Sequence, residues 1–185
     1  MHEYRVLDRE LIYRGWIYEL VAETVEMPGG GTARREFTDH SGAVVAVPVD
    51  AQGRVGMIRQ YRVPTGEYLW ELPAGLRDVE GEDPAVTARR ELAEEADLRS
   101  DRLHKLGEFY TSPGISNELI HYYLATELSP VAEADLHRRV EEEAHIELVW
   151  WELDKALAAV ADGQIRNGVC ALALNLTRLH LEASK

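Results

Sequence analysis

The segment "GLRDVEGEDPAVTARRELAEEADL", from Gly75 to Leu98, decides the fold and places eight carboxylates in twenty-four positions. Asp83 followed by Pro84 predicts the start of a helix, because the carboxylate can accept hydrogen bonds from free backbone N–H groups and proline fits the first turn. We expect this helix to end at about Ala96. The question is why so many acidic groups gather on one loop and one short helix.

Helical spacing divides this segment into a packing face and a pair of carboxylates. The packing face is a stripe of small apolar residues: Ala85, Ala88, Leu92 and Ala96. Glu91 and Glu95 lie on one flank of the stripe, one turn apart, and Glu94 points nearly opposite. Like charges at this spacing repel, so a cation is required. Either Arg89 and Arg90 supply it, or the carboxylates bind a hard divalent cation such as Mg²⁺.

The rest of the chain predicts mostly strands, followed by helices. Alternating apolar and polar residues indicate strands at 4–12, 16–26, 33–39, 43–49 and 54–61. Two later apolar runs, "LIHYYLATEL" and "HIELVWWEL", predict strands on either side of a long acidic loop. The tail changes to helical spacing in "LDKALAAVADG" and "VCALALNLTRLHLEA", and Asp154 is the expected capping residue.

Composition limits the classes of partner. The chain has 185 residues, 45% of them hydrophobic, which predicts one domain with a small extension. A net charge of −13 argues against nucleic acid or an anionic membrane as partner. The single cysteine, Cys170, lies in an apolar run and favours core packing in a reducing compartment. No stretch reads as a signal core or a membrane span, so we expect a cytoplasmic protein.

The order of the charged residues strongly resembles the Nudix box, G-x5-E-x7-R-E-U-x-E-E-x-G-U, where U is aliphatic. Two positions differ from that pattern. Six residues separate Gly75 from Glu82, and Asp97 stands where a glycine is usual. The insertion falls in a loop that can absorb it. Asp tolerates the left-handed conformation expected at position 97 better than most residues, so we expect a small loss of stability and unchanged chemistry.

Segments outside the box extend the resemblance. "LWELPAGL" before it, "TSPG" at residues 111–114 after it and "GQIRNGVCALAL" near the end look like the ADP-ribose pyrophosphatase branch of the Nudix hydrolases. "MPGGG" followed by "ARREFTDHSGAV" is similar to the N-terminal strands of that branch, and Pro113 is close to its downstream proline.

The resemblance implies an α+β fold: a Nudix-like α/β/α sandwich with a mixed β-sheet, preceded by an N-terminal antiparallel strand extension. We expect residues 1–40 to form the extension and residues 41–185 to form the Nudix hydrolase domain. In this branch the N-terminal strands commonly exchange between two subunits. The extension is therefore expected to serve dimerisation, and the protein is expected to be a homodimer.

The resemblance also implies a metal-dependent reaction, in which water attacks the diphosphate linkage of ADP-ribose and releases AMP and ribose 5-phosphate. Mg²⁺ or Mn²⁺ would be held by three carboxylates and one backbone carbonyl: Glu91, Glu95, Glu94 and Ala74. Gly75 belongs to the structural part of the box. Glu82 and Arg90 are expected to form an ion pair that holds the loop against the helix.

Candidate substrate-binding residues come from the same resemblance. Arg62 is expected to bind phosphate with its fork of donors, and Arg35 and Glu36 to face the adenosine half. Glu118 is expected to approach the terminal ribose. For the arginines the alternative is a surface ion pair, and for Glu118 it is a solvated loop position.

The catalytic base requires another carboxylate if the box glutamates are committed to metal. The acidic loop "RRVEEEAHIEL" supplies candidates, because the equivalent loop of the branch carries the glutamate that deprotonates or orients the water. Glu143 is the first choice, Glu142 the second and His145 a distant third. The alternative is that the three consecutive glutamates are only a solvated run.

Other functions remain open at this level. A different nucleoside diphosphate derivative, such as an ADP-sugar, NADH or a damaged nucleotide, would use the same box with another pocket. A nucleotide-sensing regulator usually adds a DNA-binding module, for which this chain has neither spare length nor a basic face. An acidic interaction module would need no metal, so metal binding discriminates between it and an enzyme.

Overall fold

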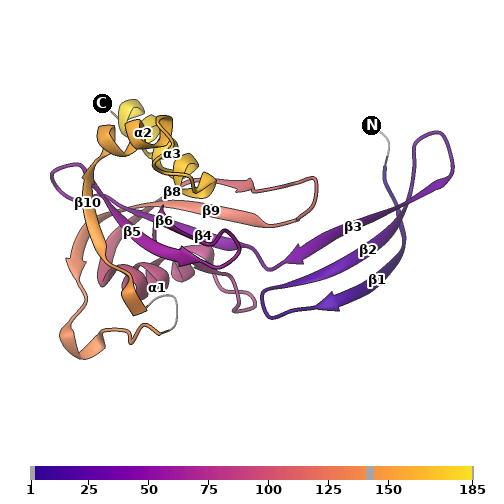
Figure 1. The fold of residues 1–185 in the computed structure, drawn as a ribbon, viewed down its shortest axis with the longest axis horizontal. Helices are drawn as coiled ribbons and strands as arrows, with labels where there is room; N and C mark the ends of the chain where they lie inside the picture. The colour runs from indigo at the N-terminus through magenta and orange to yellow at the C-terminus, as the bar shows by residue number, and fades with distance from the viewer. Residues whose placement is uncertain (1–2, 141–143, 185) are drawn as a thin grey trace. The chain divides into compact units, whose positions relative to one another are not determined.

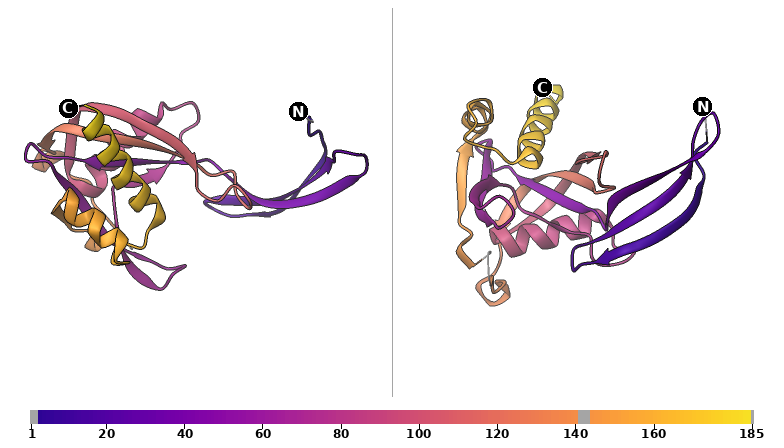
Figure 2. Two further views of the ribbon diagram at one scale, coloured as in Figure 1. Left: turned by 90° about the horizontal axis from the view of Figure 1, so that it is seen from above. Right: turned by 45° about the vertical axis from the view of Figure 1, so that its right-hand side comes forward.

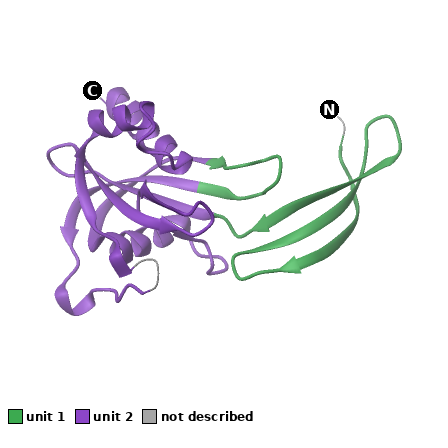
Figure 3. Ribbon diagram, in the orientation of Figure 1, with its two compact units in different colours: residues 1–42, 109–120 green, residues 43–108, 121–185 purple. Residues whose placement is uncertain are grey.

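The computed structural model describes residues 3–140 and 144–184, so Glu142 and Glu143 lie outside the described residues. The chain forms two compact units (Figure 3). One contains residues Met1–Gly42 and Phe109–Ile120, and the other contains Ala43–Glu108 and His121–Lys185.

The first unit is an antiparallel sheet in the order β1-β2-β3 (Figure 1). Its strands are β1 (Val6–Arg14), β2 (Tyr18–Glu26) and β3 (Thr32–His40). Between β2 and β3 the chain turns through Gly29, Gly30 and Gly31, all with positive φ, which only glycine adopts without strain. An isolated parallel bridge between Thr38 and Ser116 joins residues 109–120 to this sheet.

The second unit contains two sheets, in the orders β10-β5-β6 and β7-β4-β9-β8. Their strands are β4 (Ala43–Pro48), β5 (Arg54–Arg62), β6 (Glu67–Glu71), β7 (Ala74–Leu76), β8 (Leu98–Tyr110), β9 (Leu119–Pro130) and β10 (Leu148–Glu152), where the outer ends of β8 and β9 belong to the first unit. A short 3-10 helix covers Glu133–Asp135.

Three helices cover these strands. Helix α1 (Pro84–Ala96) lies on one side, and α2 (Leu153–Ala161) and α3 (Gly168–Ala183) lie on the other, as Figure 1 and the right-hand view of Figure 2 show. This arrangement confirms the predicted α+β class with a mixed sheet between helices. Within the described part of the chain, none of the helices has the length and apolar character that crossing a membrane requires.

The predicted stripe on α1 forms the core beneath it. Ala88, Leu92 and Ala96 are at most 4% exposed, and they pack with Val44 of β4 and Tyr123 of β9. The small alanine side chains let the helix approach the sheet closely. Because α1 packs on both β4 and β7, its position fixes the distance between the box carboxylates and the strand backbone.

Some sequence predictions were wrong or incomplete. Asp154 does not cap α2: the helix follows β10 directly, its N-cap position is Glu152, and Asp154 lies in the first turn, where its side chain forms an ion pair with Arg178. The predicted strand 4–12 is observed as Val6–Arg14. Strands β6, β7 and β8 were not predicted. Pro73 divides β6 from β7 and leaves two short segments, and most of β8 is polar and accessible to solvent, so it lacks the alternation of a half-buried strand.

Candidate active site

The carboxylate-bearing helix starts and ends as its sequence predicts. The Asp83 side chain accepts a hydrogen bond from the Ala85 N–H at 2.8 Å, and Pro84 occupies the first turn. At the other end Asp97 has φ 55° and ψ 32°, the left-handed conformation that ends a helix. The helix is therefore fixed at both ends, and its carboxylates have defined places.

Glu91 and Glu95 point into the protein rather than into solvent. They are only 8% and 4% exposed. The Glu95 carboxylate accepts a hydrogen bond from the Ala74 N–H at 2.8 Å. The Glu91 carboxylate lies against Gly75, where an added Cβ would overlap it. Gly75 is thus required because any side chain there would displace Glu91.

Arg90 is surrounded by carboxylates. Its guanidinium lies 2.7 Å from Glu91 and between 3.4 and 3.7 Å from Asp78, Glu82 and Glu94. Burial opposes the charge on Arg90, but the four carboxylates outweigh it and raise the pKa of the guanidinium. Arg90 therefore remains a cation that links the loop before α1 to the second half of the helix.

Thr87 supplies a contact that the sequence did not reveal. This residue is fully buried, and its hydroxyl donates a hydrogen bond to a Glu82 carboxylate oxygen at 2.7 Å. Glu82 is thus held by both Thr87 and Arg90. Glu82 lies in the loop before α1, whereas Thr87 lies in the helix. Helical periodicity therefore gives no signal for the pairing of these two residues.

The residues present fit a hard divalent cation. Across residues 3–140 and 144–184, no cluster of three or more His, Cys, Asp or Glu side chains stands ready to hold a metal ion. Glu91 and Glu95 nevertheless place two buried carboxylates one turn apart beside the β7 backbone, and oxygen ligands of this kind are those that Mg²⁺ and Mn²⁺ prefer. Glu94 is partly exposed on the same turns.

Arg62 is the last residue of β5, in the second unit, and pairs with Glu71 of the neighbouring strand β6. Its Nε and Nη2 donate to the two carboxylate oxygens of Glu71 at 3.0 and 2.6 Å. The Glu71 side chain is 4% exposed, whereas that of Arg62 is 42% exposed. A bidentate pair of this kind fixes the plane of the guanidinium while part of it stays accessible to solvent.

The other candidates lie in the first unit, on β3 and the loop 109–120. Arg35 and Glu36 are exposed on β3, where Arg35 donates to the Arg34 carbonyl at 3.0 Å. Arg34 forms ion pairs with Glu36 at 3.4 Å and with Glu10 at 2.7 Å. Arg34 is therefore a common partner of Glu36 on β3 and Glu10 on β1.

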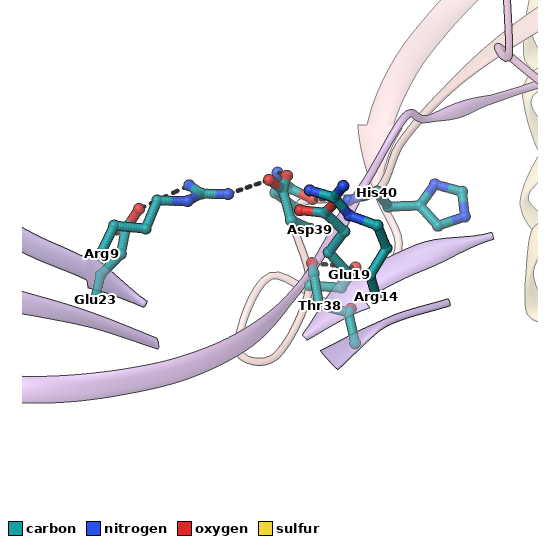
Figure 4. A network of polar contacts seen from close by, with 9 residues as sticks. Arg9, Arg14, Glu19, Glu23, Thr38, Asp39 and His40 are labelled. Carbon is teal, nitrogen blue, oxygen red and sulfur yellow. Dashed lines mark hydrogen bonds and ion pairs between the residues drawn. The ribbon is translucent and has the colours of Figure 1, made fainter. Parts of the chain in front are cut away.

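Glu118 belongs to a polar network at the end of β3, where Asp39 and His40 follow Thr38 (Figure 4). The Thr111 hydroxyl donates to Glu118 at 2.5 Å, and His40 Nε2 lies 3.8 Å from the same carboxylate. The Asn117 side-chain oxygen accepts a hydrogen bond from the backbone N–H of His40 at 2.8 Å, and the Asn117 side-chain nitrogen donates one to the Asp39 carboxylate at 2.5 Å. The loop containing the "SPG" motif is therefore fixed to β3.

A pocket of about 390 Å³ opens beside this network, lined by residues 14–19 and 39–41. Trp16 is one of the lining residues and is fully exposed. Arg14 and Glu19 form an ion pair across the turn at 2.6 Å. Arg9 joins Asp39 to Glu23 in the same unit. His40 and Asn117 were missed by sequence reasoning, since neither belongs to a motif and their contact joins residues far apart in the chain.

The chain is similar to two curated ADP-ribose pyrophosphatases. It is 40% identical over 168 residues to the protein of that name from Mycobacterium tuberculosis (strain ATCC 25618 / H37Rv), which covers 91% of this chain and 80% of that one. It is 35% identical over 185 residues to the one from Bacillus subtilis (strain 168), which covers 99% of this chain and 98% of the other.

Structure and family agree with these relatives. A crystal structure described as that of an ADP compounds hydrolase matches 100% of this chain and 97% of its own chain with a TM-score of 0.83 and 23% identity, which shows a shared fold. The NUDIX domain family matches residues 39–170, a range that includes the carboxylate-bearing helix and the buried pair Glu91 and Glu95. This chain therefore belongs to the NUDIX domain family.

Proposed function

We propose that this protein hydrolyses ADP-ribose to AMP and ribose 5-phosphate with the help of a divalent cation. One observation carries the proposal: two buried carboxylates, Glu91 and Glu95, lie against the β7 backbone in a chain that belongs to the NUDIX domain family. The similarity to two proteins named ADP-ribose pyrophosphatase favours this substrate over other nucleoside diphosphate derivatives.

The reaction adds one water across the diphosphate linkage. The water oxygen bonds to phosphorus, the bridging phosphorus–oxygen bond breaks, and both products leave as phosphomonoesters. Nudix hydrolases generally need divalent metal ions. Mg²⁺ or Mn²⁺ bound by Glu91, Glu95, Glu94 and the Ala74 carbonyl would neutralise the phosphate oxygens and lower the pKa of a bound water.

The chain's own side chains orient the substrate and move the proton. Arg62, held in one plane by Glu71 and 42% exposed, binds a phosphate group. Arg35 and Glu36, exposed on β3, contact the adenosine half. Glu118, within 3.8 Å of a histidine that lines the pocket, contacts the terminal ribose. Glu143, or Glu142 in its place, accepts the proton of the attacking water.

We also propose that the protein is a homodimer formed through residues 1–40. Every residue of β1 is exposed, including Leu7, Leu11 and Ile12, which are 42–47% exposed. An edge strand with large exposed apolar side chains is a surface that proteins normally cover. A second copy of the same extension would cover it.

The remaining part of the proposal is a cytoplasmic location. Cys170 is the only cysteine, so no disulfide can form within the chain. Its side chain is buried, and burial raises the pKa of the thiol. A neutral buried thiol behaves as a small apolar core residue, as proteins in reducing compartments commonly use it.

The purified protein is expected to convert ADP-ribose to AMP and ribose 5-phosphate with Mg²⁺ or Mn²⁺, as separated by ion-exchange chromatography. A panel of ADP-sugars, NADH and oxidised nucleotides measures its preference by kcat/KM. Failure to turn over any nucleoside diphosphate derivative with either metal would refute the enzyme. If calorimetry then detected no metal binding, the acidic interaction module would be favoured.

Glu95→Gln is expected to lower kcat by about a hundredfold or more, because a charged ligand is lost at the site where charge develops. Glutamine keeps a carbonyl oxygen that can accept the Ala74 hydrogen bond, so the thermal midpoint should change little. Glu80→Gln removes an exposed carboxylate of the loop before α1 and serves as the control. If Glu95→Gln retains activity within a few fold of wild type, Glu95 is not a principal ligand.

Glu143→Gln is expected to depress kcat by about a hundredfold at least, the lower end of what general-base assistance contributes. Metal affinity, measured by calorimetry without substrate, should change little. Glu142→Gln, measured beside it, decides between the two glutamates. Nearly full kcat in both variants under saturating ADP-ribose would place the base outside this loop.

The double substitution Leu11→Glu and Ile12→Glu is expected to convert the dimer into a monomer. Both side chains are exposed on β1, so the two added charges disrupt an interface that covers this strand. Sedimentation velocity measures the assembly, and circular dichroism confirms that the monomer is folded. Asp8→Asn is a polar control on the same strand. A wild-type protein that sediments as a monomer would contradict the proposal.

A further inference from the structure

The residue that departs from the Nudix box, Asp97, takes part in a contact that glycine could not make. It occupies the left-handed position after α1, with φ 55°. A side chain is strained there, so glycine is the residue that this conformation favours. The Asp97 carboxylate lies 2.6 Å from Nη2 of Arg139, and the two side chains are 41% and 18% exposed. The strained position thus carries a specific partner.

Arg139 comes from the acidic loop between β9 and β10. The residues from Ala132 to Arg138 are all exposed, whereas Arg139 is partly buried. Its Nε donates a hydrogen bond to the Glu94 backbone carbonyl at 2.7 Å. One guanidinium therefore binds both the last turn of α1 and the side chain that ends the helix.

Helix electrostatics favour this arrangement. The last carbonyls of an α-helix have no partner within the helix, and the partial negative charge at this end attracts cations. No Lys, Arg or His lies in the last turn of α1 itself. Arg139 supplies the missing cation from a distant part of the chain: its Nε donates to the Glu94 carbonyl, and its Nη2 forms an ion pair with the Asp97 carboxylate.

The same loop is attached at two further points, both next to the end of α1. The Val131 N–H donates to the Asp97 carbonyl at 2.9 Å. Asp135 pairs with Arg99 at 2.8 Å, between two side chains that are 56% exposed. The exposed pair contributes little, so Val131 and Arg139 hold the two ends of this loop against the helix.

We propose that Asp97 and Arg139 form a clamp that positions the loop 131–140 against the carboxylate-bearing turn of α1, and that both are positioning residues for the hydrolysis. This inference rests on the proposed function. The proposed bases Glu142 and Glu143 follow Arg139 within four positions of the sequence. Arg139 therefore anchors the described end of the loop from which the proposed base comes.

The clamp is tested with Asp97→Asn, Arg139→Gln and their combination. Asparagine tolerates the left-handed conformation, so Asp97→Asn removes the charge with little added strain. Each single variant is expected to lower kcat about tenfold, since small displacements of catalytic groups reduce rates steeply. KM and Mn²⁺ affinity should stay within about twofold. The double variant should be no slower than the slower single one, because both changes break one contact.

Arg138→Gln is the matched control, because it removes an exposed arginine next to the clamp and should leave kcat unchanged. Single variants with wild-type kcat would overturn the proposal, and so would a double variant whose loss is the product of the single losses. A loss of Mn²⁺ affinity that parallels the loss of kcat would also overturn it, since the role would then lie in the metal site.

Limited trypsin digestion separates this proposal from the proposed function. Cleavage after Arg138 and Arg139 is expected to be at least fivefold faster in Asp97→Asn than in wild type, at equal thermal stability. Cleavage at the wild-type rate would refute the clamp whatever the activity. Faster cleavage in a protein that hydrolyses no nucleoside diphosphate derivative would refute the proposed function and, with it, the positioning role, while leaving the contact itself in place.

Discussion

The burial of two carboxylates, Glu91 and Glu95, is the constraint on which the second unit depends. A charged group removed from water is unstable unless hydrogen bonds or opposite charges replace the lost hydration. The Glu95 carboxylate accepts a hydrogen bond from the Ala74 N–H, and the Glu91 carboxylate forms an ion pair with Arg90. Each of these partners is held in turn: Ala74 by its strand, and Arg90 by the acids of the loop before the helix.

Packing and charge therefore act together at helix α1. Alanines at positions 88 and 96 let the helix approach the sheet, and the close approach brings Glu91 onto the backbone of Gly75. A larger residue in the stripe would move the helix outward and separate the carboxylates from β7. The apolar face of α1 thus fixes the geometry of its polar flank.

Local patterns were predictable from the sequence, and long-range pairings were not. Periodicity identified α1, its Asp83 cap and its buried stripe, because these depend on residues within one or two turns. Strands β6 to β8 lack a clean alternation and were missed. The start of α2 was placed too late because Asp154 is a common capping residue, whereas here β10 runs directly into the helix.

The same limit applies within the candidate site. The box spacing identified the carboxylates, but which cation each one meets depends on the folded chain. Arg90 contacts four acids, and Thr87 binds Glu82 from a buried position. Arg62 reads as a phosphate ligand in the sequence, yet its plane is set by Glu71 on the neighbouring strand. Sequence gives the set of charged groups, and the fold selects the pairs.

Asp97 shows how such a pair can make an unfavourable residue tolerable. A non-glycine residue in the left-handed conformation is destabilised by about 1–2 kcal/mol. A cation at a helix C-terminus contributes about 0.3–1 kcal/mol, and more when partly buried, and Arg139 is both partly buried and bound to the Asp97 carboxylate. The two effects are of similar size, so the substitution of the usual glycine need not weaken the fold. What it adds is an ion pair between the helix end and Arg139, which glycine has no side chain to form.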